Sequence, residues 1–251
     1  IEERKQRFVL LGSSARKLKT AGTNLLAGRA TWKCMYPFVP AELGADFALE
    51  RVLRQGSLPL VWMAEDRDQV LRDYAQLYLK EEIRSEALVR NLPGFARFLS
   101  LAALFHGQTL NVASLARESA TARTTVVGYL DILEETLLAT RLQAFEARLR
   151  VRERKHPKLY WVDPGLVRAL KKQLGPLTQE ERGPLLEGFV HGLLRAHGET
   201  HELFDELSYW SPAQGKVEVD FLLQRGKHYL ALEVKAGKKL LPEMFSGLRA
   251  V

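Results

Sequence analysis

The 251 residues of this chain, 46% hydrophobic and 27% charged, suffice for one to three globular domains with buried cores. Cys34 is the one cysteine, so no internal disulfide can form, which favours a reducing compartment and a cytoplasmic location. No apolar run approaches the roughly 20 residues of a membrane span, so we expect no membrane partner. The net charge of +7 favours polyanionic partners.

The first third of the chain predicts a buried strand followed by helices. Residues 7–14, RFVLLGSS, form a short continuous apolar run that ends in a Gly-Ser turn, as in a strand of a parallel sheet. Residues 41–55 and 66–86 predict helices, the second with apolar residues near helical spacing.

The middle of the chain predicts a winged helix-turn-helix. Its expected elements are a helix over 93–105, a short helix capped by Asn111, a helix capped by Thr121, and two extended segments, 138–142 and 158–162. Three helices followed by a hairpin in this order are typical of that motif.

A basic segment joins the two extended pieces. Residues 141–158 contain seven Lys/Arg and two Glu, a local charge of +5. Such a segment is either a wing that grips phosphates without sequence preference or a solvated loop of a domain spacer, and we favour phosphate contact. The residues expected to contact nucleic acid are Arg148, Arg150, Arg152, Arg154, Lys155 and Lys158.

The last third predicts a separate α/β unit after a linker over 175–184 that contains two Gly-Pro pairs. We expect a helix over 185–196, an extended segment over 207–210, a hairpin over 217–235 and the start of a further helix. The chain stops inside that last helix, so we expect its C-terminus to be truncated.

The predicted hairpin separates apolar from charged side chains. With a turn centred on Arg225-Gly226, Gln224 pairs with Lys227, and Asp220 faces Ala231. Since side chains alternate along a strand and paired residues share a face, one face is entirely apolar. It holds Val217, Val219, Phe221, Leu223, Leu230, Leu232 and Val234. The opposite face holds Glu218, Asp220, Glu233 and Lys235, with Leu222, Tyr229 and Ala231 nearer the turn.

This charged face has two interpretations. Asp220 and Glu233 offer the oxygen ligands that magnesium or manganese prefers, and Lys235 is placed to activate a water or to stabilise developing negative charge. Alternating charges on a solvated strand face are the equally weighted alternative.

Asp220 followed by Glu233-Val234-Lys235 resembles the PD-(D/E)xK nuclease motif, although Val219 stands where that motif has proline. The resemblance implies that Asp220, Glu233 and Lys235 are catalytic, with Asp220 and Glu233 as metal ligands. It further implies a glutamate from the preceding helix, a place that Glu187 in LLEGFV fills.

The order of motifs in this chain resembles that of prokaryotic AAA-type ATPases with an appended C-terminal domain of unknown function. The resemblance rests on FVLLGSSARKL, LLAGRA, the winged-helix segment, HPKLYWVDPGL, LLEGFV and EVDF…LEVKAG. The resemblance implies a multi-domain α/β protein: the end of an AAA-type ATPase domain with its helical lid over 1–90, a winged-helix domain over 91–174, and a truncated restriction-endonuclease-like domain over 175–251.

In such a protein Ser13 and Ser14 end a strand that senses the γ-phosphate, and Arg29 reaches a neighbouring subunit's nucleotide or is an ordinary surface arginine. The phosphate-binding pattern G-x-x-x-x-G-K-[ST] does not occur in this sequence, so we expect ATP binding, and assembly into a homo-oligomer, in the parent protein only.

We therefore expect the C-terminal fragment of an AAA-type ATP-binding protein with a nuclease-like domain, associated with nucleic acid. Two alternatives stay open. One is a magnesium- or manganese-dependent nucleic-acid hydrolase, and the other is a noncatalytic nucleic-acid- or protein-binding module with a vestigial acidic site.

Overall fold

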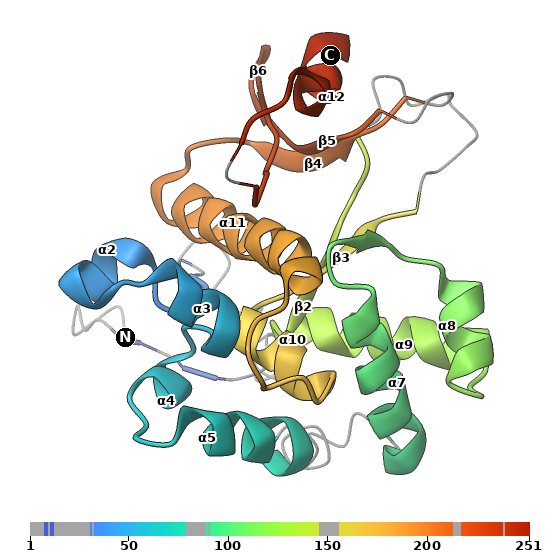
Figure 1. Ribbon diagram of the computed structural model, residues 1–251. Coiled ribbons are helices and arrows are strands. Elements are labelled where there is room, and N and C mark those ends of the chain that lie inside the picture. Colours follow the sequence, from blue (N-terminus) through green and yellow to red (C-terminus); the bar gives the residue numbers. More distant parts are fainter. Residues whose placement is uncertain are drawn as a thin grey trace, which may run out of the picture.

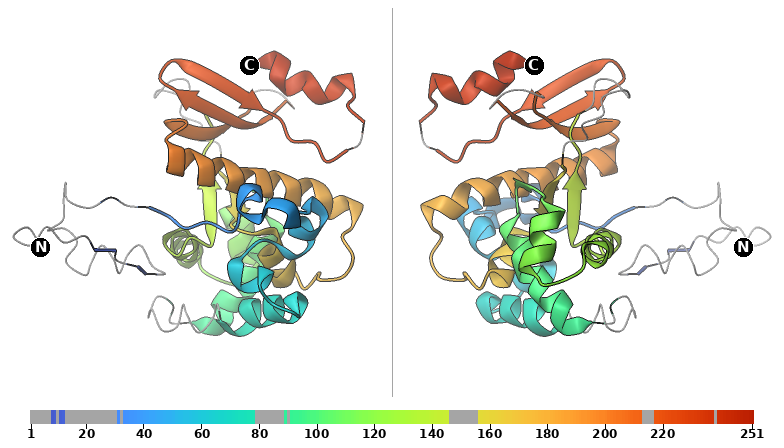
Figure 2. Two further views of the ribbon diagram at one scale, coloured as in Figure 1. Left: turned by 90° about the vertical axis from the view of Figure 1, so that its left-hand side faces the viewer. Right: turned by 90° about the vertical axis from the view of Figure 1, so that its right-hand side faces the viewer.

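The computed structural model describes residues 8–9, 11–12, 31, 33–78, 89, 91–145, 156–212, 217–237 and 239–251. Within these residues the protein is a mixed α/β structure with two three-stranded antiparallel sheets. The long helix α11 (Gln179–His201) lies between the C-terminal sheet and the helical body (Figure 1), and the side views of Figure 2 show the same layering. None of the described helices combines the length and the apolar character needed to cross a membrane.

The described residues of the strand predicted over 7–14, among them Phe8, Val9 and Leu11, are exposed and lie in no strand, so that prediction of a buried strand is wrong for them. Short helices make up the described part from residue 40 onward. They are α2 (Pro40–Leu43), η2 (Gly44–Asp46), α3 (Leu49–Gln55), α4 (Pro59–Trp62), α5 (Arg67–Asp73) and the π-helical turn η3 (Tyr74–Tyr78). The continuous helix predicted over 41–55 is wrong, because Gly44 at φ +52° ends α2 and the extended Ala48 precedes a new helix. The helix predicted over 66–86 begins at Arg67 under an Asp66 cap, and its residues after 78 lie outside the described part.

The central part follows the predicted order with one added strand. Its elements are α7 (Leu92–Leu104), β1 (Gln108–Thr109), α8 (Val112–Glu118), α9 (Arg123–Glu135), β2 (Ala139–Leu142) and β3 (Lys158–Trp161). Strand β3 pairs antiparallel with both β1 and β2 and is the middle strand of this sheet.

Of the two helix caps predicted here, one is confirmed. The Asn111 side chain accepts a hydrogen bond from the Ser114 N–H at 3.0 Å and caps α8. The Thr121 cap is wrong, because the chain enters α9 one residue later, through Ala122. The Thr121 hydroxyl instead donates to the Ser119 carbonyl.

Most of the buried apolar residues form one core around α7, α8, α9 and α10 (Pro164–Leu170). Helix α10 packs against α3 closely enough that a Cβ on Gly165 would stand 2.2 Å from the Gln55 carbonyl oxygen. The last helix of the central part is thereby fixed to the first described helices.

The C-terminal part consists of β4 (Glu206–Trp210), β5 (Val219–Arg225), β6 (His228–Leu232), η4 (Pro242–Phe245) and α12 (Ser246–Ala250), packed on α11. Helix α11 is longer than the predicted 185–196, because Thr178 and Glu181 form a capping box at its start. Pro184, which we read as part of a linker, therefore lies inside the helix.

The hairpin register differs from the predicted one by two residues. Arg225 pairs with His228 across a turn at Gly226, which has φ +58°, so Phe221 faces Leu232 and Leu222 faces Ala231. Over the paired residues, 221–225 and 228–232, a shift of two residues keeps each side chain on its predicted face, because side chains alternate with a period of two. The predicted pairs were thus wrong, and the predicted division into faces is kept within this ladder.

A second, smaller core connects the two sheets. Leu142 and Tyr160 from the central sheet pack with Tyr209 and Phe221 from the C-terminal sheet. The chain after β2 also bonds to β4, since the Phe145 N–H donates to the Tyr209 carbonyl at 2.7 Å. This contact between the sheets is where the charged end of β5 meets the start of β3.

Candidate acidic site

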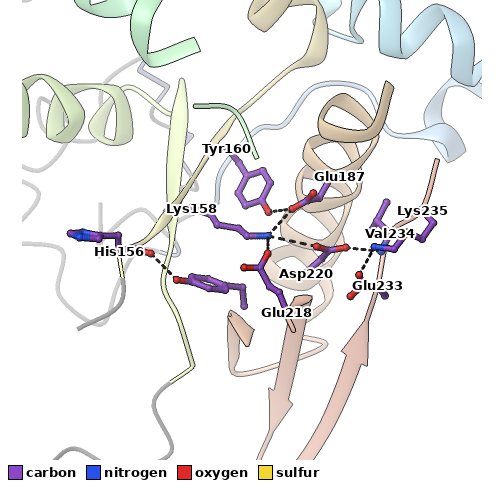
Figure 3. A network of polar contacts seen from close by, with 10 residues as sticks. His156, Lys158, Tyr160, Glu187, Glu218, Asp220, Glu233, Val234 and Lys235 are labelled. Atoms are coloured by element: carbon purple, nitrogen blue, oxygen red, sulfur yellow. Dashed lines mark hydrogen bonds and ion pairs between the residues drawn. The ribbon is translucent and has the colours of Figure 1, made fainter. Parts of the chain in front are cut away.

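Three carboxylates surround the ammonium group of Lys158 (Figure 3). Its Nζ lies 3.0 Å from Glu187 Oε1, 2.5 Å from Glu218 Oε1 and 3.6 Å from Asp220 Oδ1. Glu187 comes from α11, Glu218 directly precedes β5, and Asp220 lies in β5. We call these four side chains the Lys158 cluster.

Lys158 reaches the cluster from the other sheet, as the first residue of β3, and only 3% of it is exposed. Its Nζ also lies 5.6 Å from the centre of the Tyr209 ring. The Tyr209 hydroxyl donates to the His156 carbonyl at 2.7 Å and holds the backbone just before Lys158. The lysine is therefore held on both its backbone and its side chain.

Tyr160 contributes a hydroxyl from the same strand. It donates to Glu187 Oε1 at 2.5 Å, and its ring stacks on His191 with ring centroids 4.3 Å apart. Lys158 and Tyr160 are two residues apart and so leave β3 on the same side. One oxygen of Glu187 thus accepts from both residues, which fixes the carboxylate from two directions.

Burial and charge oppose each other at Lys158. Burial lowers the pKa of the Lys158 ammonium, but the carboxylates of Glu187, Glu218 and Asp220 raise it well above its ordinary value. Burial raises the pKa of Glu187, an effect that the Lys158 charge partly offsets. The ammonium is therefore charged at neutral pH and supplies the cation that the buried carboxylates need.

The residues of the nuclease-like motif lie beside this cluster. Asp220 Oδ2 accepts the Val234 N–H at 2.8 Å, which ties β5 to the chain just after β6. Glu233 Oε1 forms an ion pair with Lys235. Glu233 Oε2 is buried and has no hydrogen-bond partner among the described residues. Asp220 and Glu233 are largely buried, so this part of the charged face is not the solvated strand face that we weighed as an alternative.

The oxygens of this region suit a hard divalent cation by type. No group of three or more His, Cys, Asp or Glu side chains within the described residues could hold a metal ion. Asp220 and Glu233 are the predicted ligands. The Lys158 ammonium lies between Asp220 and the carboxylates of Glu187 and Glu218. A metal ion would have to displace that ammonium.

The structure therefore brings Glu187 and Asp220 together through Lys158, with Glu233 and Lys235 paired next to them. It corrects the interpretation of Lys158, which is buried in the cluster and is not a surface residue that contacts nucleic acid. Several predicted residues lie outside the described part of the chain: Ser13, Ser14, Arg29, Arg148, Arg150, Arg152, Arg154 and Lys155.

Sequence reasoning placed Glu218 on the charged face beside Asp220 but gave it no role, and it missed Lys158 and Tyr160 as partners of these carboxylates. The signal was present in KLYW, where Lys158 and Tyr160 share one side of a strand with mostly apolar neighbours. A charge count along the chain assigned Lys158 to the basic segment instead.

Comparison with known proteins gives two matched regions. Residues 46–177 match a family described as a domain of unknown function, DUF8612, and residues 182–251 match a second one, DUF4143. The uncharacterized protein Mb2031c of Mycobacterium bovis and the uncharacterized protein Rv2008c of Mycobacterium tuberculosis are each 28% identical over 236 residues. These alignments cover 91% of this chain and 52% of each relative, so the chain spans about half the length of the curated relatives it matches. No solved structure matches it significantly.

Proposed function

The chain belongs to the DUF8612 family, whose function is unknown, and we propose that it is part of an AAA-type ATP-binding protein, binds nucleic acid and does not cleave it. The proposed parts are the end of an ATPase domain, a winged-helix unit over 91–174, and a nuclease-like unit over 175–251 that serves as a noncatalytic partner.

The observation that carries the proposal is the position of the Lys158 ammonium. A nuclease of the PD-(D/E)xK type needs its carboxylates free to hold a divalent metal and a reactive water. Here Glu187, Glu218 and Asp220 all face a lysine that is almost fully buried between two sheets. A closed acidic site of this kind argues against metal-dependent hydrolysis.

The order of elements supports the winged-helix part. A helix, a short strand, two helices and a two-stranded hairpin follow one another from α7 to β3, and the strands form one sheet. Likewise α11, which carries Glu187, precedes the strands that carry Asp220 and lead to Glu233, as the resemblance to the nucleases implies.

The proposed nucleic-acid contact is the basic segment between β2 and β3. The residues at its two ends are not free for phosphates: Arg141 pairs with Asp131 at 2.7 Å and with Glu134, and Lys158 lies in its cluster. The five cations left for phosphate contact are Arg148, Arg150, Arg152, Arg154 and Lys155.

A metal-dependent nucleic-acid hydrolase is the second candidate. One observation favours it: Glu233 Oε2 is buried without a partner in the described structure, which is costly unless a cation or water approaches. This candidate requires Lys158 to leave the carboxylates.

Fluorescence anisotropy with a short duplex, repeated over a series of salt concentrations, tests the proposal. Replacing Arg150, Arg152 and Arg154 by Ala should weaken binding to unrelated sequences alike. It should also reduce the slope of log K against log salt by about 0.9 for each lost phosphate contact. An unchanged slope would assign the segment to a solvated spacer.

A matched triple variant controls for net charge. Replacing the exposed or partly exposed Arg54, Arg72 and Arg182 by Ala removes the same charge from α3, α5 and α11 and should leave the slope unchanged. The same duplex, incubated with manganese or magnesium, should stay intact. Metal-dependent cleavage that Asp220→Asn with Glu233→Gln abolishes would refute the noncatalytic role and establish the hydrolase.

A further inference from the structure

We propose that the cleft between α11 and the turn of the β5–β6 hairpin binds a small amphiphilic anion, a free molecule with an aliphatic body and a carboxylate at one end. The cleft has a volume of about 460 Å³, which falls within the roughly 300–1,000 Å³ typical of small-molecule sites. It shares no lining residue with the Lys158 cluster and involves no nucleic acid, so this inference goes beyond the proposed function.

The cleft lies where α11 and the C-terminal sheet stop packing tightly. Helix α11 runs along one face of that sheet (Figure 2). His191 of α11 stacks on Phe221 of β5 with ring centroids 6.0 Å apart, and Phe221 is fully buried. Leu230 lies on the same face of the hairpin but nearer the turn, and 60% of it is exposed. The two layers therefore leave space at the turn end of the hairpin that no described side chain fills.

Apolar side chains make up most of the wall of the cleft. They include Val190, Leu193 and Leu194 of α11, Leu203 of the segment that follows, Leu223 of β5 and Leu230 of β6. Leu203, like Leu230, is largely open to water, with 49% of it exposed. A concave apolar wall in contact with water favours a ligand whose aliphatic body displaces that water.

The end of the cleft at the hairpin turn is positively charged. Arg225 pairs with His228 across the turn, so their side chains lie on the same face of the hairpin, and both line the cleft. Arg225 forms no ion pair with any described residue, and no described Asp or Glu lines the cleft. Asp205 lies near the turn, but its Oδ2 accepts the Gly226 N–H at 2.7 Å and it is not part of the wall.

These two features together define the ligand. The apolar wall takes an aliphatic chain, and the guanidinium of Arg225 at its end takes a carboxylate, which arginine binds through two parallel hydrogen bonds. A fatty acid of medium length has this shape and this charge. A neutral aliphatic molecule would fill the wall and leave the guanidinium without a partner.

Isothermal titration calorimetry of the whole chain with a series of straight-chain carboxylates tests the site. From hexanoate to decanoate the affinity should rise about fourfold with each CH₂ that enters the cleft, because each buried methylene adds a similar transfer free energy. The rise should stop once the chain fills the cleft. Decanol, which has the same body without the charge, should bind about tenfold more weakly than decanoate.

Two variants assign binding to the cleft. Arg225→Gln should weaken decanoate binding about tenfold and leave decanol binding unchanged. Leu230→Glu, which puts a carboxylate on the apolar wall, should abolish binding of decanoate. Lys227→Gln removes a neighbouring exposed charge, and Leu240→Glu adds the same charge at an exposed leucine elsewhere. Neither residue lines the cleft, so both controls should bind decanoate as the wild type does.

The melting temperature of each variant without ligand checks its fold. Arg225 is exposed and has no ion pair within the described part of the chain, so Arg225→Gln should melt as the wild type and remains decisive even if Leu230→Glu does not fold. The inference is overturned if millimolar decanoate gives no heat of binding, if affinity does not follow chain length, or if decanol binds as tightly as decanoate. Equal binding by Arg225→Gln and the wild type would overturn it as well.

Two other occupants have their own signatures, and either would replace the small ligand. A dimer in sedimentation experiments that Leu230→Glu dissociates, without any decanoate binding, would assign the cleft to a second copy of the chain. Binding to vesicles that contain phosphatidylglycerol, but not to free decanoate, would assign it to a lipid surface. Because none of these measurements contains nucleic acid, their outcome leaves the test of duplex binding untouched.

Discussion

Replacement of Asp163 by Asn should change how the stability of the protein depends on pH. Asp163 is fully buried and precedes α10. Its Oδ1 accepts the Leu166 N–H at 3.0 Å and caps the helix, while its Oδ2 accepts the Ser57 N–H at 2.7 Å. One carboxylate thus joins α10 to the loop between α3 and α4, which lies 106 residues earlier in the chain.

Burial raises the pKa of Asp163 from 3.8 to about 6, although backbone N–H groups, that of Ser57 first, lower it. A carboxyl whose folded pKa is raised contributes stability that is fully present below the unfolded pKa and is lost as the pH rises through the folded one. The rise corresponds to about 3 kcal/mol, of which about 2 kcal/mol is gained between pH 7 and pH 4.5.

Urea denaturation of the wild type and of Asp163→Asn at several pH values measures this contribution. Other titrating groups, such as Glu187, Glu181 and Glu199, are common to both proteins and cancel in the difference. The stability of the wild type relative to the variant should therefore increase on acidification. At neutral pH Asp163→Asn should still be the less stable, since an amide cannot accept both N–H groups through its oxygen and nitrogen. Parallel pH profiles for the two proteins would refute this reasoning.

Three further substitutions test the backbone and the packing of the helical part. Gly56→Ala should destabilise the protein by more than about 2 kcal/mol, because Gly56 has φ +77° and a Cβ there would stand 1.9 Å from Asp163 Oδ1. Gly44→Ala, also at positive φ (φ +52°, ψ −122°) but with open space around it, should cost about 1–3 kcal/mol from backbone strain alone, which is less than Gly56→Ala costs in the same urea denaturation, and equal costs would contradict the role of the close contact. Arg168→Met should cost about 3–5 kcal/mol in urea denaturation, because it leaves Glu181 and three backbone carbonyl groups without the buried guanidinium. A variant as stable as the wild type would show that those groups find other partners.

The sequence by itself determined the local features of this protein. The alternation of residues in the hairpin predicted which side chains share a face, and within the paired residues 221–225 and 228–232 this prediction holds although the register was wrong by two residues. The Asn111 cap could also be predicted from the sequence, since capping depends on the next three residues alone. Features of this kind follow from neighbours in the chain.

The tertiary structure alone decided the candidate site. Lys158 and Glu187 lie 29 residues apart and come from strand β3 and helix α11, so no spacing rule connects them. A count of charges along the chain placed Lys158 with the basic segment. In the structure Lys158 is buried at the start of β3, and its ammonium contacts three carboxylates. Whether a charged side chain contacts solvent or a partner depends on which distant elements exclude water around it, and a local pattern holds no information about that.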